Sequence, residues 1–159
     1  MELKQAQAVA AEVVAELMHV CSMIEIVGSI RRQRPTVRDI DLVVLPTSLA
    51  ALDSKLRSMG CDFGGPKIRR LVYKGARVDI YIATEQTWAT LLLIRTGSTR
   101  HNVHLCARAR LRGMQLKANG EGLLDTQGKR VAGESEQSIF AALGLKYRDP
   151  QEREFGWGQ

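Results

Sequence analysis

Two aspartates inside an apolar strand are the feature that most constrains this chain. Residues 39–45 read Asp-Ile-Asp-Leu-Val-Val-Leu, and Pro46 follows them. The apolar run predicts a strand, although aspartate is unfavourable in strands. Residues two apart in a strand share a face, so Asp39 and Asp41 are expected to point the same way while the alternate apolar residues point to the core.

A third aspartate lies in a second strand pattern. In residues 76–83, Val78, Ile80 and Ile82 form the expected core face, which leaves Asp79 on the opposite face. If the two strands are neighbours, three carboxylates converge, and two carboxylates about 4 Å apart repel by roughly 4 kcal/mol at an effective dielectric near 20. Proteins tolerate this by sharing a proton or by binding a cation, and hard oxygen ligands select Mg²⁺ or Mn²⁺. Two such ions suit in-line phosphoryl transfer.

The turn Gly28-Ser29-Ile-Arg-Arg lies between the first strand pattern and the aspartates. Gly28 permits close approach of the backbone to a ligand, Ser29 offers a hydroxyl, and Arg31 or Arg32 offers a guanidinium fork for phosphate. An isolated Asp-x-Asp is common on solvated strand edges and is weak evidence for a site, and an isolated Gly-Ser is weaker evidence still. A phosphate cradle beside a carboxylate cluster, however, is typical of a nucleotidyl transferase.

Composition sets the broad class. The 159 residues are 45% apolar and 25% charged, as in ordinary globular proteins, and the net charge is +6. This charge permits a nucleic-acid partner, although a solubilising basic surface would give the same value. The three cysteines have no metal-ligand spacing and fit a reducing compartment, and no signal or membrane-spanning segment is recognisable. We therefore expect a cytoplasmic protein without a membrane partner.

Periodicity and turn residues predict the remaining elements. Expected helices cover 3–22, 47–60, 85–97, 99–114 and 135–145; a short strand covers 24–27; hairpins cover 69–83, turning at Lys74-Gly75, and 120–133; the tail is extended. This divides the chain into an α+β half, residues 1–84, and a more helical, basic half, residues 85–159.

Several of these segments resemble a known family. "GSIRR", "RDIDLVV" and "RVDIYIA" are similar to the palm of the nucleotidyltransferase superfamily, and "LLLIRTGSTRHNVHL" with the ending "IFAALGLKYRDPQER" resembles family X DNA polymerases, the relatives of DNA polymerase beta. The resemblance implies an α+β fold: a palm of mixed sheet flanked by helices over 1–84, then a small helical C-terminal subdomain over 85–159 that contacts nucleotide and template. The chain resembles the shortest members, which keep the catalytic core alone.

The resemblance also implies roles for individual residues. Asp39, Asp41 and Asp79 match the catalytic carboxylates that bind two Mg²⁺ ions, with Mn²⁺ as a substitute. The residues that match nucleotide-binding positions are Gly28, Ser29, Arg32, Thr96, Gly97, Ser98, Thr99 and Asn102. The residues expected to contact DNA are Arg100, His104, Cys106, Arg108, Arg110 and Arg112.

The sequence departs from the family pattern in a few places. Ile94-Arg95 stands where the family usually has an aromatic pair, and Cys106 stands where several members place an arginine against the templating base. Thr99 stands where some members have an aspartate. His101 and His104 lie among arginines, and we interpret both as surface or DNA-facing residues.

The resulting prediction is a monomeric, template-directed DNA polymerase that adds deoxynucleotides to the primer 3′-hydroxyl of a gapped or primer-template duplex, filling short gaps in DNA repair. The alternatives are a template-independent nucleotidyltransferase acting on RNA or a small molecule, and a non-catalytic DNA-binding module. Extension that follows the template base would distinguish the template-directed polymerase from the template-independent transferase. The presence of all three aspartates argues against a non-catalytic DNA-binding module.

Overall fold

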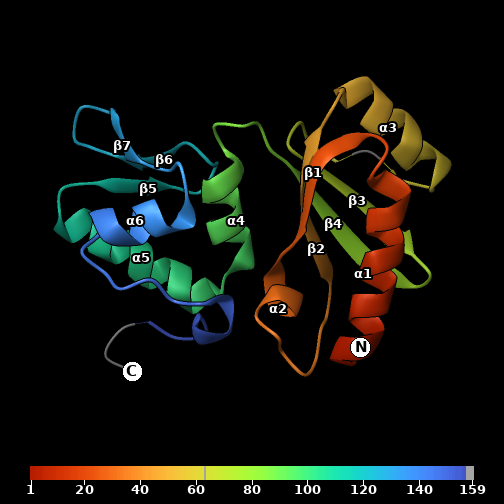
Figure 1. The fold of residues 1–159 in the computed structure, drawn as a ribbon, viewed down its shortest axis with the longest axis horizontal. Helices are drawn as coiled ribbons and strands as arrows, with labels where there is room; N and C mark the ends of the chain where they lie inside the picture. Colours follow the sequence, from red (N-terminus) through yellow and green to blue (C-terminus); the bar gives the residue numbers. More distant parts are fainter. Residues whose placement is uncertain (63, 157–159) are drawn as a thin grey trace. The chain divides into compact units, whose positions relative to one another are not determined.

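The computed structural model describes residues 1–62 and 64–156 (Figure 1). The chain forms two compact units, Met1–Thr84 and Glu85–Gln159, and each is described by itself. In the described part of the chain, the helices are too short or too polar to cross a membrane.

The first unit is built on a four-stranded mixed sheet with the order β1-β2-β4-β3. Its strands are β1 (Cys21–Ile26), β2 (Ile40–Pro46), β3 (Ile68–Tyr73) and β4 (Ala76–Ile82). The outer pairs are antiparallel, and the central pair, β2 with β4, is parallel. The expected mixed sheet flanked by helices is therefore confirmed.

Two helices, α1 (Leu3–Leu17) and α3 (Leu49–Ser58), form the core of this unit with one face of the sheet. A short helix, α2 (Gly28–Arg31), connects β1 to β2. The buried core contains Ala6, Ala10, Val13 and Leu17 of α1, Leu52 and Leu56 of α3, Ile40, Leu42 and Val44 of β2, and Val78 and Ile80 of β4. The alternation in the sequence thus predicted the core face of both central strands correctly.

Two boundaries differ from the prediction. The first helix ends at Leu17, and Cys21 begins β1, because β1 pairs with β2 back to Pro46. This pairing overrides the helical spacing of the apolar residues. Asp39 lies in a bend just before β2, so the strand itself carries only Asp41.

The second unit contains three helices and a small sheet. The helices are α4 (Trp88–Thr96), α5 (Thr99–Leu111) and α6 (Glu136–Ala142), and the strands, in the order β5-β6-β7, are β5 (Gln115–Lys117), β6 (Gly122–Leu124) and β7 (Arg130–Ala132). The expected hairpin is present as β6 and β7. The strand β5 was missed: Gly113 has a φ of 72° and ends α5 early, and the chain then pairs with β6.

The last described segment of the chain forms a strap, residues 145–156, with one 3₁₀ turn at Pro150–Glu152. Arg153 of this strap is fully buried, and its Nη1 donates to Glu136 Oε2 at 2.6 Å. Its Nε donates to the Arg148 carbonyl, and its guanidinium lies 5.4 Å from the centre of the Phe140 ring. A buried ion pair therefore fixes the strap to the start of α6.

The substitution Arg153→Met tests this anchor. It leaves the Glu136 carboxylate buried without its cation, and removing one partner of a buried pair costs about 3–5 kcal/mol. We expect the free energy of unfolding to fall by this amount in urea denaturation followed by tryptophan fluorescence, because Trp88 belongs to the second unit. The exposed control Arg110→Met should change it by less than about 0.5 kcal/mol. Equal stability of the two variants would contradict the role of the strap.

Candidate active site

Two of the three aspartates lie side by side in the first unit. Asp41 of β2 and Asp79 of β4 are register partners in the parallel pair. Both alternate with core residues and therefore lie on the sheet face opposite the core formed with α1 and α3. The predicted juxtaposition of Asp41 and Asp79 follows directly from this register.

Two arginines hold the Asp79 carboxylate. Arg70 Nε of the neighbouring strand β3 lies 3.2 Å from Asp79 Oδ1, and Arg77 Nη2 lies 3.4 Å from Asp79 Oδ2. The Asp79 side chain is only 7% exposed, whereas Arg70 and Arg77 are 58% and 50% exposed. The arginines thus shield the carboxylate from solvent and offset its charge.

The sequence analysis gave Arg77 and Arg70 no role, although the predicted turn at Lys74-Gly75 was enough to place Arg70 opposite Asp79. Lys74 and Gly75 both have positive φ, which is the two-residue turn typical of tight hairpins. Counting outward from this turn pairs Arg70 with Asp79, as the structure shows.

Asp39 acts on the same arginine as Asp79. The pKa of the Arg77 guanidinium is raised above its ordinary value, mainly by the charge of Asp79 and their hydrogen bond, and further by the charge of Asp39. Asp39 is half-buried in the bend before β2. Asp39 and Asp79 therefore act on the same guanidinium group.

The Gly28 turn lies against Asp41. Gly28 has a φ of 63°, and a Cβ atom at this position would collide with Asp41 Oδ2. Only glycine fits here for both reasons, since other residues rarely adopt this conformation. The backbone bearing Ser29 and Arg32 is thus kept next to one of the two strand carboxylates, and both of these side chains are half-buried.

The donor set suits a hard divalent cation, because it consists of carboxylate oxygens on adjacent strands. In the arrangement seen, no three His, Cys, Asp or Glu side chains of residues 1–62 and 64–156 gather closely enough to hold a metal ion. The Asp79 carboxylate is instead paired with Arg70 and Arg77. Cation binding at this site would therefore require Asp79 to exchange arginine contacts for the ion.

In the second unit, Thr96, Gly97 and Ser98 form the turn between α4 and α5. Thr96 is fully buried, Gly97 has a φ of 75°, and the Gly97–Ser98 peptide is cis. Ser98 caps α5: its Oγ accepts a hydrogen bond from the His101 N–H and donates to the Glu154 carbonyl. The strap thus fixes this turn as well as the start of α6.

The first turns of α5 differ partly from expectation. Thr99 and Arg100 are exposed, and the Arg100 guanidinium lies 5.6 Å from the centre of the Phe155 ring. Asn102 Nδ2 donates to the Ile94 carbonyl at 2.8 Å, which joins α5 to α4. His101 is fully buried near Phe140, so its interpretation as a surface residue was wrong.

Cys106 is half-buried beside a hollow of about 200 Å³ that Arg110, Gln115 and Leu116 also line. Burial raises the pKa of the Cys106 thiol, and the charge of Arg110 partly opposes this shift. Arg108 lies elsewhere: its Nε donates to the Leu143 carbonyl at 2.9 Å. The residues expected to contact DNA therefore do not form one surface.

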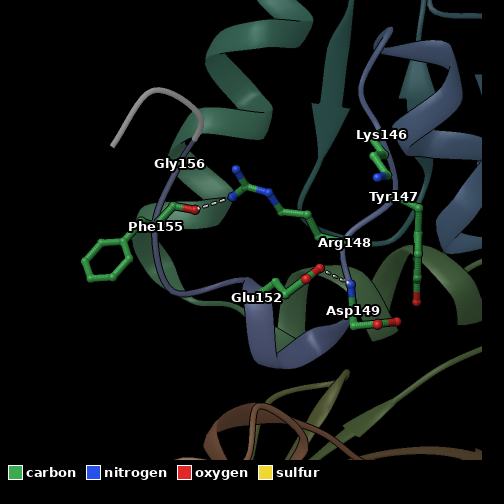
Figure 2. A pocket seen from close by; sticks show the side chains of 7 residues that line it. All are labelled: Lys146, Tyr147, Arg148, Asp149, Glu152, Phe155 and Gly156. Carbon is green, nitrogen blue, oxygen red and sulfur yellow. Dashed lines mark hydrogen bonds between the residues drawn. The ribbon is translucent and has the colours of Figure 1, made fainter.

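Figure 2 shows a hollow of about 670 Å³ that residues of the strap line. Arg148 Nη1 donates to the Phe155 carbonyl at 2.7 Å, and the Asp149 N–H donates to Glu152 Oε2 at 3.1 Å. Both hydrogen bonds join residues of the strap to one another and stabilise its fold. None of the predicted site residues lines this hollow, so we assign it no role.

The comparisons with known proteins agree on one family. The model of the DNA polymerase beta thumb matches residues 91–154. "DNA polymerase/3′-5′ exonuclease PolX" of Bacillus subtilis (strain 168) is 28% identical over 142 residues, 81% of this chain and 24% of that protein. DNA polymerase lambda of Rattus norvegicus is 32% identical over 88 residues, 50% of this chain and 15% of that protein.

The fold has a close counterpart among solved structures. The polymerase beta of Leishmania infantum, in a ternary P/T complex, matches 97% of this chain and 76% of that one with a TM-score of 0.82 and 22% identity. The chain spans about a quarter or less of the length of the two curated relatives. The thumb match and the two polymerase relatives support assignment of the chain to the family X DNA polymerases, and the solved structure shows the shared fold.

Proposed function

We infer that this chain carries the nucleotidyl-transfer site of a DNA polymerase, which extends a primer 3′-hydroxyl under the direction of a template and fills short gaps during DNA repair. The observation that carries this proposal is the register pairing of Asp41 with Asp79, with the Gly28 turn pressed against Asp41. The proposed partners are deoxynucleoside triphosphates and gapped or primer-template DNA.

The residues that would hold divalent metal are Asp39, Asp41 and Asp79. Bound Mg²⁺ or Mn²⁺ supplies charge stabilisation for phosphoryl transfer and lowers the pKa of the attacking hydroxyl. The 3′-oxygen forms a bond to the α-phosphorus, the bond to the β-phosphate oxygen breaks, and pyrophosphate leaves. The proton of the 3′-hydroxyl would pass to the Asp79 carboxylate.

The remaining residues bind and orient. The Gly28–Ser29 backbone and the Arg32 guanidinium are proposed to hold the triphosphate, because amide and guanidinium groups donate to phosphate oxygens. In the second unit, the Thr96–Ser98 turn would lie under the incoming sugar and Asn102 near the incoming base. Arg70 and Arg77 would keep Asp79 ordered until substrate and metal arrive.

Asp79→Asn tests the site. Asparagine keeps the size of the side chain but not its charge, so we expect the fold and deoxynucleotide binding to persist while single-turnover extension of a one-nucleotide-gapped duplex falls by several orders of magnitude. Circular dichroism checks the fold, and a fluorescent nucleotide titration checks binding.

The matched control is Glu25→Gln, an exposed carboxylate on β1 that pairs with Val43 and so lies on the same sheet face. It should extend like the wild type. Extension by Asp79→Asn at the wild-type rate would exclude Asp79 as a catalytic carboxylate. Wild-type incorporation that ignores the template base would instead favour a template-independent transferase.

A second test concerns the DNA partner. With a net charge of +6, the chain should bind duplex largely through Lys and Arg contacts to phosphate. Each neutralised phosphate should add about 0.9 to the slope of log affinity against log salt concentration. We expect a steep slope in fluorescence anisotropy titrations between about 50 and 200 mM salt. A slope near zero would show that DNA is not the main partner.

A further inference from the structure

The arginines near the end of α5 divide between two faces of the helix. Residues two apart on a helix point in nearly opposite directions, whereas residues four apart share a face. Cys106 and Arg110 border the hollow beside β5, and Arg108 and Arg112 share the other face, which meets the end of α6.

Arg108 and Arg112 converge on one point of the backbone, Gly144. An atom in the Cβ position of Gly144 would lie 3.2 Å from Arg112 Nη1 and 3.4 Å from Arg108 Nη2. The separation of these two nitrogens therefore cannot exceed the sum of those distances. A single phosphate group fits between guanidinium groups so spaced, because each N–H···O contact spans about 2.7–2.9 Å.

This convergence is electrostatically unfavourable as it stands. Like charges four residues apart destabilise a helix. In the described part of the chain, neither Arg108 nor Arg112 forms an ion pair with a carboxylate. The C-termini of α5 and α6 supply together at most about one unit of negative partial charge, so about one positive charge remains for a ligand.

Only part of the arrangement has a structural explanation. Arg108 Nε caps the end of α6 by donating to the Leu143 carbonyl, which satisfies a backbone group that the helix leaves open. The remaining nitrogens of Arg108 stay available. The Arg112 side chain is exposed and donates no hydrogen bond to any residue that the structure describes.

A hollow with a partly apolar lining adjoins Arg108. It measures about 250 Å³ and is lined by His104, Ala107, Arg108, Leu111 and Leu145. Leu111 is 84% exposed. Arginines beside an apolar wall suit a phosphodiester with its attached sugar better than a free phosphate ion, because the sugar carbons can cover the wall.

We propose that Arg108 and Arg112 clamp one backbone phosphate of a nucleic-acid strand, at a site separate from the α5 face that carries Asn102, Cys106 and Arg110. The proposal rests on the proposed DNA polymerase function for the identity of the strand. It places a second contact with DNA on the side of α5 facing Gly144, away from the bases of the reacting pair.

Arg112→Gln is the cleanest probe, since Arg112 has no structural hydrogen bond to lose. In anisotropy titrations of a gapped duplex, we expect the salt slope to fall by about 0.9, the loss of one phosphate contact. The double variant Arg108→Gln/Arg112→Gln should also lose about 0.9, because both arginines hold the same phosphate. The control Lys129→Gln removes one exposed charge from the same unit and should leave the slope unchanged.

The outcomes separate the two proposals. A wild-type slope near zero removes the DNA partner and with it the proposed function. A steep wild-type slope that Arg112→Gln does not change overturns the clamp alone. A second arm titrates inorganic phosphate into the protein and follows the arginine side-chain N–H signals by NMR. Perturbation of Arg108 and Arg112 by phosphate without any effect on the DNA slope would mean a small-anion site and would also overturn the clamp.

Discussion

The repulsion between Asp41 and Asp79 is the constraint around which the first unit is organised. The parallel pairing of β2 with β4 fixes them as neighbours, and their charges must be offset. Arg70 and Arg77 offset the charge of Asp79. Because both arginines are half-exposed, their hold is modest and can yield to a divalent cation, which offers more charge at shorter range. The proposed metal-binding role therefore requires these arginines to release Asp79 when the ion binds.

The alternation of apolar and polar residues was sufficient to predict which side chains of β2 and β4 face the core, and hence that Asp41 and Asp79 share the other face. It was not sufficient to place Asp39, because alternation continues through the bend before β2 while the hydrogen-bonded ladder does not. The predicted length of the first helix, α1, was wrong for a related reason. Helical spacing extends to Cys21, but only the partner strand decides where pairing begins.

In the second unit, the burial of His101 could have been predicted from the sequence. His101 is buried because it lies four and eight residues before Leu105 and Ala109, on the same buried face of α5, a spacing visible in the sequence alone. Arg153 could not have been found in this way. Its burial depends on Glu136 and on the ring of Phe140, which only the folded strap brings together.

The central position of β4 has a consequence for synthesis of the chain. Strands β1 and β2 precede α3 and β3, so a nascent chain that stops short of Ala76 presents β2 with one edge unpaired. That edge is a run of apolar residues, the type of surface that joins strands of other molecules. Fragments truncated before β4 should therefore aggregate instead of folding, and the two carboxylates first meet when the last strand of the sheet has been made.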